Sequence, residues 1–387
     1  MIYLDNHATT RLDPRVLESM LPWLTDHYGN AGSVTHEMGR EAREAVDAAR
    51  DTFARAIGAT AREIVFTSGA TESNNLAILG TAVRRGQALG HVITVATEHH
   101  AVLDPVEHLE RTGFAVTRLP VASGTGILPT DALDAAFRAD TFLVSVMLAN
   151  NEIGVVQDIP AIAERVHARG AVLHVDCAQA IGRLPLNVDA LGADLASFSA
   201  HKFHGPKGAG CLYVRRRERV ARVDPLVFGG GQERGMRSGT LDVPGIVGLA
   251  EAARLAVEGL PEEPGRLRVL RDRLWSLLQA GVPGITLNGP ALDDGAQRLV
   301  NNLNVRIPGI DGQSLLATVA GDGLAVSSGS ACSSENPRPS HVLQAIGLHE
   351  DDARASLRFG LSRFTTADEI DRAAAIVASG VARLRAI

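Results

Sequence analysis

Short apolar runs alternate with amphipathic segments between residues 63 and 216 of the chain. The runs are short and rich in β-branched residues, which is typical of buried strands, and they lie at residues 63–67, 91–95, 141–146 and 171–175. The segments between them, such as 74–85 and 159–169, place apolar residues at helical spacing. This alternation predicts an α/β fold with a mainly parallel central sheet and helices on both faces.

A polar stretch rich in proline and glycine, residues 258–265, interrupts the pattern and predicts a domain junction. We expect a large domain over residues 13–258. A smaller α+β domain is expected to combine residues 1–12 with residues 259–387.

Composition narrows the class of protein. The chain has 387 residues, 45% of them hydrophobic, and a formal net charge of −6, so it predicts a globular protein without the basic surface that binds nucleic acid. The N-terminus lacks the pattern of a signal peptide, and no apolar run approaches membrane-spanning length. We therefore expect a cytoplasmic protein that acts on a small molecule and contacts neither membrane nor nucleic acid.

The three cysteines, Cys177, Cys211 and Cys332, show no CxxC spacing, so the sequence predicts neither a disulfide framework nor a structural zinc site. Cys177 and Cys211 lie in or beside apolar strands, which is typical of buried thiols. Cys332 lies instead in a small, polar, proline-containing segment, residues 325–340. We expect an exposed thiol on a flexible tether, a candidate nucleophile.

Lysine usage points to one residue. Of the 38 basic residues only Lys202 and Lys207 are lysines, and both lie within residues 201–208. A bias towards arginine explains why surface lysines are missing, but it does not explain why two neighbouring lysines remain. Arginine replaces lysine as a solvated charge, whereas it forms no imine with an aldehyde. Lys202 is therefore predicted to carry an aldehyde cofactor as a Schiff base.

Polar residues follow several of the predicted strands. Residues 67–73 run from a strand into a helix, which suits a phosphate or is simply an ordinary helix cap. Asp176 ends the strand at 171–175, where a carboxylate could keep a pyridine nitrogen protonated, cap a loop or bind a metal. Ser199 and His201 add a hydroxyl and an imidazole beside Lys202, an arrangement suited to a phosphate and an aldehyde together.

Three further residues could bind a ring or a substrate. His99 follows the strand at 91–95, so its imidazole could lie over a planar ring and transfer protons. A metal site at His99 and His100 is disfavoured, because no acidic or cysteine partner falls at ligand spacing. Asn151 could hold a carboxylate or a ring oxygen. Arg358, inside an apolar run, is either a surface charge or a bidentate grip on a substrate carboxylate.

Together these segments resemble the cysteine desulfurases of the class-V aminotransferase superfamily, in the nitrogen-fixation and iron–sulfur-assembly branch. These enzymes have the fold type I of pyridoxal-phosphate enzymes. The resemblance covers nearly the whole chain, and its specific motifs are residues 3–10, 67–75, 150–157, 197–208, 233–240 and 327–332. Ala200 departs from the pattern, because many relatives have glycine there.

The resemblance implies a role for each candidate residue around pyridoxal 5′-phosphate. Lys202 would form the Schiff base, Asp176 would contact the pyridine nitrogen, Gln179 the ring oxygen, and His99 would stack on the ring. The phosphate would be held by Ala70, Thr71, Ser199 and His201, with Thr240 of the partner subunit. Asn151 and Arg358 would bind the substrate carboxylate, and Cys332 would form a persulfide. No metal is implied.

The resemblance also implies an activity and partners. A homodimer would convert L-cysteine to L-alanine and leave the sulfur as a persulfide on Cys332, for delivery to an iron–sulfur scaffold or a tRNA-thiolation protein. The sequence ends at Ile387, before the extension that many assembly-branch members use to contact their scaffold, so the acceptor stays open.

Other activities stay open beside it. A selenocysteine lyase would use the same residues, whereas a carbon–sulfur lyase or an aminotransferase would not need Cys332. A noncatalytic binding protein is disfavoured, because Lys202, Asp176 and His99 occur together.

Overall fold

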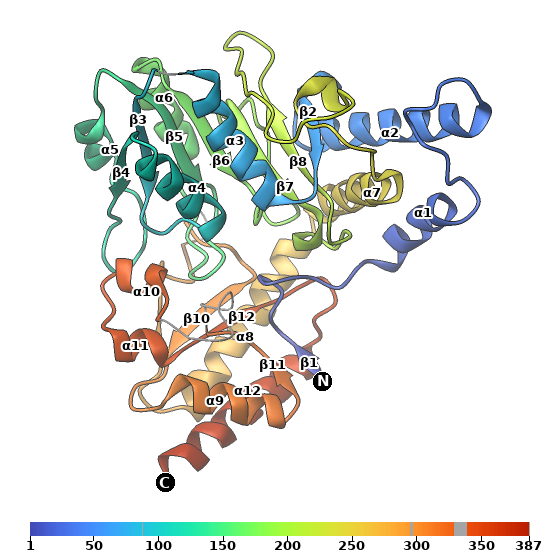
Figure 1. Ribbon diagram of the computed structural model, residues 1–387. Coiled ribbons are helices and arrows are strands. Elements are labelled where there is room, and N and C mark those ends of the chain that lie inside the picture. The colour runs from blue at the N-terminus through green and yellow to red at the C-terminus, as the bar shows by residue number, and fades with distance from the viewer. Residues whose placement is uncertain (87, 295–296, 329–338, 387) are drawn as a thin grey trace.

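The computed structural model of this chain describes residues 1–86, 88–294, 297–328 and 339–386. These residues form two units that lie one above the other in Figure 1. The seven-stranded unit contains a large sheet with its covering helices. The three-stranded unit contains a smaller sheet, the C-terminal helices and the N-terminal strand. The predicted α/β class is confirmed.

The large sheet is mainly parallel, as the sequence predicts. Its strands are β2 (Ile64–Thr67), β3 (His91–Val95), β4 (Ala115–Leu119), β5 (Thr141–Met147), β6 (Val172–Asp176), β7 (Leu195–Ser199) and β8 (Gly210–Val214). The spatial order is β2-β8-β7-β6-β5-β3-β4. The five strands from β7 to β4 are parallel, and β8 runs antiparallel to both β7 and β2. The carboxyl ends of the parallel strands therefore meet at one edge of the sheet.

Helices cover both faces of this sheet. They are α1 (Pro14–Leu24), α2 (Glu37–Ala56), α3 (Ala70–Arg84), α4 (His100–Arg111), α5 (Thr130–Ala136), α6 (Ile159–Ala168) and α7 (Val243–Gly259), with short 3-10 turns η1 (Ala61–Glu63), η2 (Ala200–Lys202) and η3 (Glu233–Gly235). Alternate side chains of each strand face opposite layers. In β2, Ile64 and Phe66 pack in the cluster that includes α2 and α7, while Val65 packs with α3.

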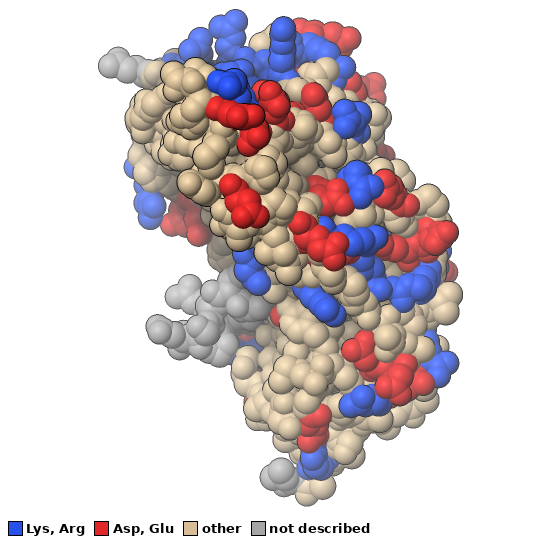
Figure 2. Space-filling model, turned by 90° about the vertical axis from the view of Figure 1, so that its right-hand side faces the viewer, with Lys and Arg blue, Asp and Glu red and all other residues tan. Residues whose placement is uncertain are grey.

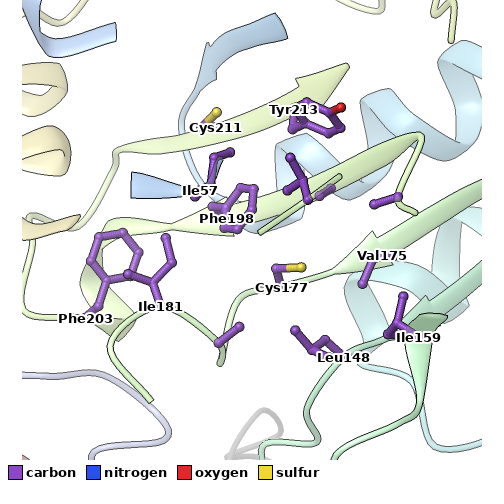
Figure 3. Packing of buried hydrophobic residues seen from close by; sticks show 14 of the residues in the cluster. Ile57, Leu148, Ile159, Val175, Cys177, Ile181, Phe198, Phe203, Cys211 and Tyr213 are labelled. Carbon is purple, nitrogen blue, oxygen red and sulfur yellow. The ribbon is translucent and has the colours of Figure 1, made fainter. Parts of the chain in front are cut away.

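The largest hydrophobic cluster lies on the α2 and α7 side of the sheet. Phe53 of α2 meets Phe198 of β7 edge to face, with ring centroids 5.5 Å apart. Cys177 and Cys211 lie in the same cluster (Figure 3). Burial raises the pKa of both thiols. The prediction that these two cysteines are buried structural residues is confirmed.

The three-stranded unit has a separate hydrophobic cluster. Its sheet has the order β12-β10-β9 and is antiparallel, with β1 and β11 forming a small parallel pair beside it. The strands are β1 (Ile2–Tyr3), β9 (Thr286–Leu287), β10 (Asn302–Arg306), β11 (Leu324–Ala325) and β12 (Ser356–Gly360). Its helices are α8 (Glu263–Gly281), α9 (Gly312–Gly321) and α12 (Ala367–Arg385). The short helices α10 (His341–Ala345) and α11 (Glu350–Arg354) come from the same part of the chain, but their buried side chains pack in the cluster of the large sheet.

The N-terminus belongs to this unit although it is distant in sequence, because Ile2 and Leu4 pack with Leu357.

The described surface shows no large field of one sign on the face drawn in Figure 2, where basic and acidic side chains are interspersed. No helix in the described ranges combines the length and the apolarity needed to cross a membrane.

Candidate active site

A cavity of about 490 Å³ opens at the carboxyl edge of the parallel strands. Nine of the predicted site residues line it: Ala70, Thr71, His99, Asn151, Asp176, Gln179, Ser199, His201 and Lys202. They come from five separate segments, which the sheet brings together because each follows or ends a neighbouring strand. Arg358 and Thr240 lie outside this lining, and Cys332 lies outside the described residues.

Asp176 is the last residue of β6 and is only 5% exposed. Its Oδ2 accepts a hydrogen bond from Asn74 Nδ2 at 2.8 Å, and its Oδ1 accepts one from the Ala178 N–H at 2.9 Å. These two donors orient the carboxylate at the floor of the cavity. The sequence did not single out Asn74, because an asparagine inside a helix carries no pattern of its own.

A neutral polar row continues from Asp176 across the sheet. His174, two residues earlier on the same strand, is fully buried. Its Nδ1 lies 2.8 Å from Ser145 Oγ and its Nε2 lies 3.0 Å from Ser197 Oγ. Burial lowers the pKa of His174 to about 4, so the ring is neutral at neutral pH. This row therefore adds no positive charge beside the Asp176 carboxylate.

Lys202 ends the short turn that follows β7. Its Nζ donates to the carbonyl oxygens of His7 and Ala8, each at 2.7 Å. The amine is therefore held at the cavity wall by the N-terminal segment. Lys207 also lines the cavity, so position alone does not separate the two lysines.

Gln179 connects the cavity to the N-terminal segment. Its Nε2 donates to the His7 carbonyl oxygen at 3.0 Å, and its Oε1 lies 3.2 Å from His7 Nδ1 and also accepts from Arg183 Nη1. Arg183 Nη2 donates to the Lys202 carbonyl oxygen at 3.0 Å. Burial, followed by the charge of Arg358, lowers the pKa of Arg183 to about 10. Sequence analysis did not identify His7 and Arg183. The His7 carbonyl oxygen accepts from the Lys202 amine, and Arg183 donates to the Lys202 backbone carbonyl oxygen.

His99 caps the N-terminus of α4. Its Nδ1 accepts from the Ala101 N–H at 3.0 Å, so in the neutral ring Nε2 carries the proton. Burial lowers the pKa of His99, although the charge of Asp176 acts in the opposite direction. The result is an imidazole that exchanges protons through Nε2.

The N-terminus of α3 faces the same cavity. Among the described residues no side chain caps this helix, whose N-cap is Gly69 with φ of 151°. The backbone of Gly210 comes so close that a Cβ there would lie 2.4 Å from Gly69 Cα. Backbone N–H groups at such a terminus, with Ser199 and His201 beside them, form a set of donors that suits a phosphate.

Arg358 is not a surface charge, which corrects one of the two interpretations from sequence. It lies in the middle of β12 and is 2% exposed. Its Nη2 pairs with Asp5 Oδ1 at 2.8 Å, and its Nη1 donates to the Asn151 carbonyl oxygen at 3.3 Å. Arg358 therefore reaches the cavity through Asn151 rather than by lining it.

Comparisons with known proteins agree with this geometry. The family model described as "Aminotransferase class-V" matches residues 2–373. The cysteine desulfurase IscS of Edwardsiella ictaluri (strain 93-146) is 50% identical over 99% of this chain and 93% of its own length. The chain belongs to the class-V aminotransferase family.

Solved structures give the same result. A "NifS-like protein" superposes with a TM-score of 0.91 at 38% identity, covering 99% of this chain and 100% of its own. The structure "SspA in complex with cysteine" superposes with a TM-score of 0.82 at 36% identity, covering 95% of this chain and 100% of its own. The fold type that the sequence resemblance implied is confirmed.

The class-V aminotransferase family uses pyridoxal 5′-phosphate, and the described cavity fits that group. The fit rests on complementary chemistry at the ends of the cavity. A carboxylate with two fixed donors lies at the floor, where Asp176 would contact the pyridine nitrogen. The uncapped start of α3 would hold the phosphate, and the Lys202 amine would reach the aldehyde.

Proposed function

We propose that this chain is a cysteine desulfurase that converts L-cysteine to L-alanine and retains the sulfur as a persulfide on Cys332. The observation that supports this most strongly is that Lys202, Asp176 and His99 line one cavity. The chain is also 50% identical to the cysteine desulfurase IscS described above. A selenocysteine lyase would use the same cavity, and a comparison of the two substrates distinguishes the activities.

The roles proposed for the cofactor-binding residues come from the family resemblance, and their places along the cavity support them. When bound, pyridoxal phosphate acts as an electron sink for the carbon that bears the substrate amino group. Asp176 would keep a proton on the ring nitrogen, and Gln179 would face the ring oxygen. His99 would lie over the ring. Lys202 would bind the aldehyde and, once displaced by the substrate amine, would stay within reach as a base at Nζ.

Substrate orientation is assigned to Asn151 and Arg358. The Asn151 side chain lines the cavity, and Arg358 is attached to the backbone of the same residue. A guanidinium has five N–H donors, so the pair with Asp5 leaves donors for a substrate carboxylate.

Sulfur transfer then requires a thiolate. The Cys332 sulfur attacks the substrate sulfur, the substrate C–S bond breaks as the S–S bond forms, and a proton is added at the substrate β-carbon, giving L-alanine. His99 Nε2 and Lys202 Nζ would move that proton, and this assignment is supported by the place of both side chains in the cavity lining. The overall change needs no external oxidant or reductant.

The deciding experiment is the Cys332→Ala variant. It should keep the cofactor absorption band and still respond spectroscopically to L-cysteine, because neither step uses this thiol. It should carry no persulfide and should release alanine far more slowly than the parent, as measured by alkylation mass spectrometry and an alanine assay. Turnover of L-cysteine at the parent rate would instead indicate a lyase or an aminotransferase, and the desulfurase proposal would be wrong.

We further propose a homodimer, with Thr240 completing the phosphate site of the partner subunit. Thr240 is exposed and is not among the residues that line the cavity of its own chain. Exposed apolar side chains support an interface. Leu17, Leu21 and Leu24 lie on one face of α1, and Tyr28 follows them in the sequence. Phe228 is also 81% exposed.

The domain division at residues 258–259 also stays a proposal, with residues 1–12 joining the small domain. It is supported by the separate hydrophobic clusters around the two sheets, with α10 and α11 as the exception, because they pack in the cluster of the large sheet. The sulfur would pass from Cys332 to an acceptor protein, an iron–sulfur scaffold or a tRNA-thiolation protein.

A further inference from the structure

The segment that carries Asn151 is held by three hydrogen bonds of the neighbouring Asn150 side chain. Asn150 Oδ1 accepts hydrogen bonds from the Glu152 N–H at 2.8 Å and the Ile153 N–H at 3.0 Å. Asn150 Nδ2 donates to the Thr97 carbonyl oxygen at 3.0 Å. Asn151 therefore lies in a turn that these hydrogen bonds fix, and it is the direct neighbour of Glu152 in the chain.

Glu152 contacts the C-terminal part of the chain at three points. Its carbonyl oxygen accepts from Asn302 Nδ2 at 3.0 Å and from Asn304 Nδ2 at 3.1 Å, both on β10. Glu152 is 5% exposed, and its Oε2 accepts from Ser340 Oγ at 2.5 Å. Burial raises the pKa of Glu152 to about 7, against the opposing effects of the Ser340 hydrogen bond and Arg358. A carboxyl group this buried requires a partner, and Ser340 is that partner.

Ser340 has a second role at the start of α10. Its Oγ accepts from the Leu343 N–H at 3.1 Å, which caps the helix. The next residue, His341, makes a parallel contact, because its Nε2 lies 2.9 Å from the carbonyl oxygen of Glu98, the residue before His99. The start of α10 is thus attached to the residues adjoining Asn151 and His99.

The chain on the N-terminal side of Cys332 is also attached to the site. Ser327 pairs with Arg358 through the backbone, with the Arg358 N–H donating to the Ser327 carbonyl oxygen at 2.6 Å. The residues between Ser327 and Ser340 include Cys332. Its two described flanks therefore join the two residues assigned to the substrate carboxylate: Ser327 joins Arg358 directly, and Ser340 joins Asn151 through Glu152.

We propose that the Glu152–Ser340 hydrogen bond is a positioning contact that fixes Ser340, a described residue on the C-terminal side of Cys332, relative to Asn151, and so speeds sulfur transfer to Cys332. This inference rests on the proposed desulfurase function. Glu152 and Ser340 are not among the residues that line the cavity. Capping α10 requires only the hydrogen bond that Ser340 accepts from the Leu343 N–H. The hydrogen bond that Ser340 donates to Glu152 is not needed for the cap, and the positioning role is assigned to that bond.

The test compares variants that break this bond from either side with a matched loss of a helix cap. Ser340→Ala removes the hydroxyl, and Glu152→Leu removes the acceptor while leaving the cap. Asp311→Ala is the control, because Asp311 caps α9 through hydrogen bonds to Ser314 within its own helix. Ser340→Thr restores the hydroxyl.

Each holoenzyme is mixed with L-cysteine in a single turnover, and two rates are followed: the change in the cofactor absorption band and the appearance of persulfide on Cys332. Ser340→Ala and Glu152→Leu should each slow persulfide formation about five- to tenfold and leave the spectral rate within about twofold. The double variant should be no slower than either single one, since both remove the same bond. Ser340→Thr should recover the parent rate, and Asp311→Ala should change neither rate.

Persulfide formation at the parent rate in both Ser340→Ala and Glu152→Leu would overturn the positioning role while leaving the proposed function intact. An equal fall of both rates would overturn it too, because it would indicate general damage to the site. A parent enzyme without persulfide on Cys332 would overturn the desulfurase proposal itself, and this inference with it.

Discussion

The cofactor end and the substrate end of the site are built differently. At the cofactor end, Asp176 lines the cavity and its hydrogen bonds come from Asn74 and Ala178, within the seven-stranded unit. At the substrate end, Arg358 belongs to the other unit and is 2% exposed; it pairs with Asp5 of its own unit and donates to the Asn151 carbonyl oxygen of the seven-stranded unit. The carboxylate proposed to bind the cofactor is therefore held within one unit, whereas the arginine proposed to bind the substrate reaches the site through a contact between units.

This difference separates two kinds of failure. Loss of a group at the cofactor end should remove the chromophore, because the residues there would touch the cofactor itself. Loss of a group at the substrate end should leave the chromophore and change how L-cysteine is held. The predictions below test that separation, from the largest effect to the smallest.

Lys202→Ala should abolish the lysine-bound absorption band and reduce kcat by about 10³-fold or more, because no other group at that position can bond to the aldehyde and then act as a base. The spectrum of the purified protein and a steady-state assay measure the two effects. Lys207→Arg is the matched control, since Lys207 also lines the cavity, and it should keep the band. A lysine-bound band that survives in Lys202→Ala and disappears in Lys207→Arg would move the cofactor to Lys207.

Arg358→Lys should raise KM for L-cysteine about tenfold or more while the absorption band stays unchanged. An ammonium group cannot hold Asp5 and a substrate carboxylate in the same planar arrangement as a guanidinium. Asp5→Asn, which keeps a hydrogen-bond acceptor but removes the charge, should raise KM by a smaller factor, about threefold. Steady-state kinetics with a spectrum of each variant measure both. A lower KM in Asp5→Asn would mean that Asp5 competes with the substrate instead of orienting Arg358.

The same contrast explains what the sequence could predict. Residues at the cofactor end follow strands directly, so an apolar run followed by Asp176 or His99 identifies them by position alone. Lys202 was identified by its rarity. These signals are local, and the cavity brings together nine of the residues that they and the family resemblance indicated.

The supporting residues were not predictable in this way. Arg183, His7 and Glu152 act through contacts with residues far away in the sequence, such as Glu152 with Ser340, 188 positions later. In a chain rich in arginine, Arg183 also resembles any surface charge, and its burial becomes apparent only after folding. Arg358 shows the same limit, because sequence could not choose between exposure and burial for an arginine in an apolar run. The expected exposure and flexibility of Cys332 stay predictions.

The smallest effect concerns Glu152, which lies where the two ends meet. Burial raises its pKa from 4.5 to about 7. As the pH rises, the carboxyl group of Glu152 loses its proton in the unfolded chain before it does so in the folded protein. The contribution of Glu152 to the free energy of unfolding is therefore complete below pH 4.5 and is lost as the pH rises towards 7. Glutamine does not titrate, so the stability of Glu152→Gln relative to the parent should rise by roughly 2 kcal/mol between pH 5 and pH 8.

Thermal midpoints of the two holoenzymes at both pH values measure this change, which should amount to a few degrees. Glu44→Gln on the exposed face of α2 is the control and should run parallel to the parent. Comparing the two variants removes the contributions of other titrating groups, such as His174, which are common to both. If the thermal midpoint of Glu152→Gln changed with pH in the same way as that of the parent, Glu152 would stay charged in the folded protein. Its contact with Ser340 would then join an ion to a hydroxyl instead of two neutral groups.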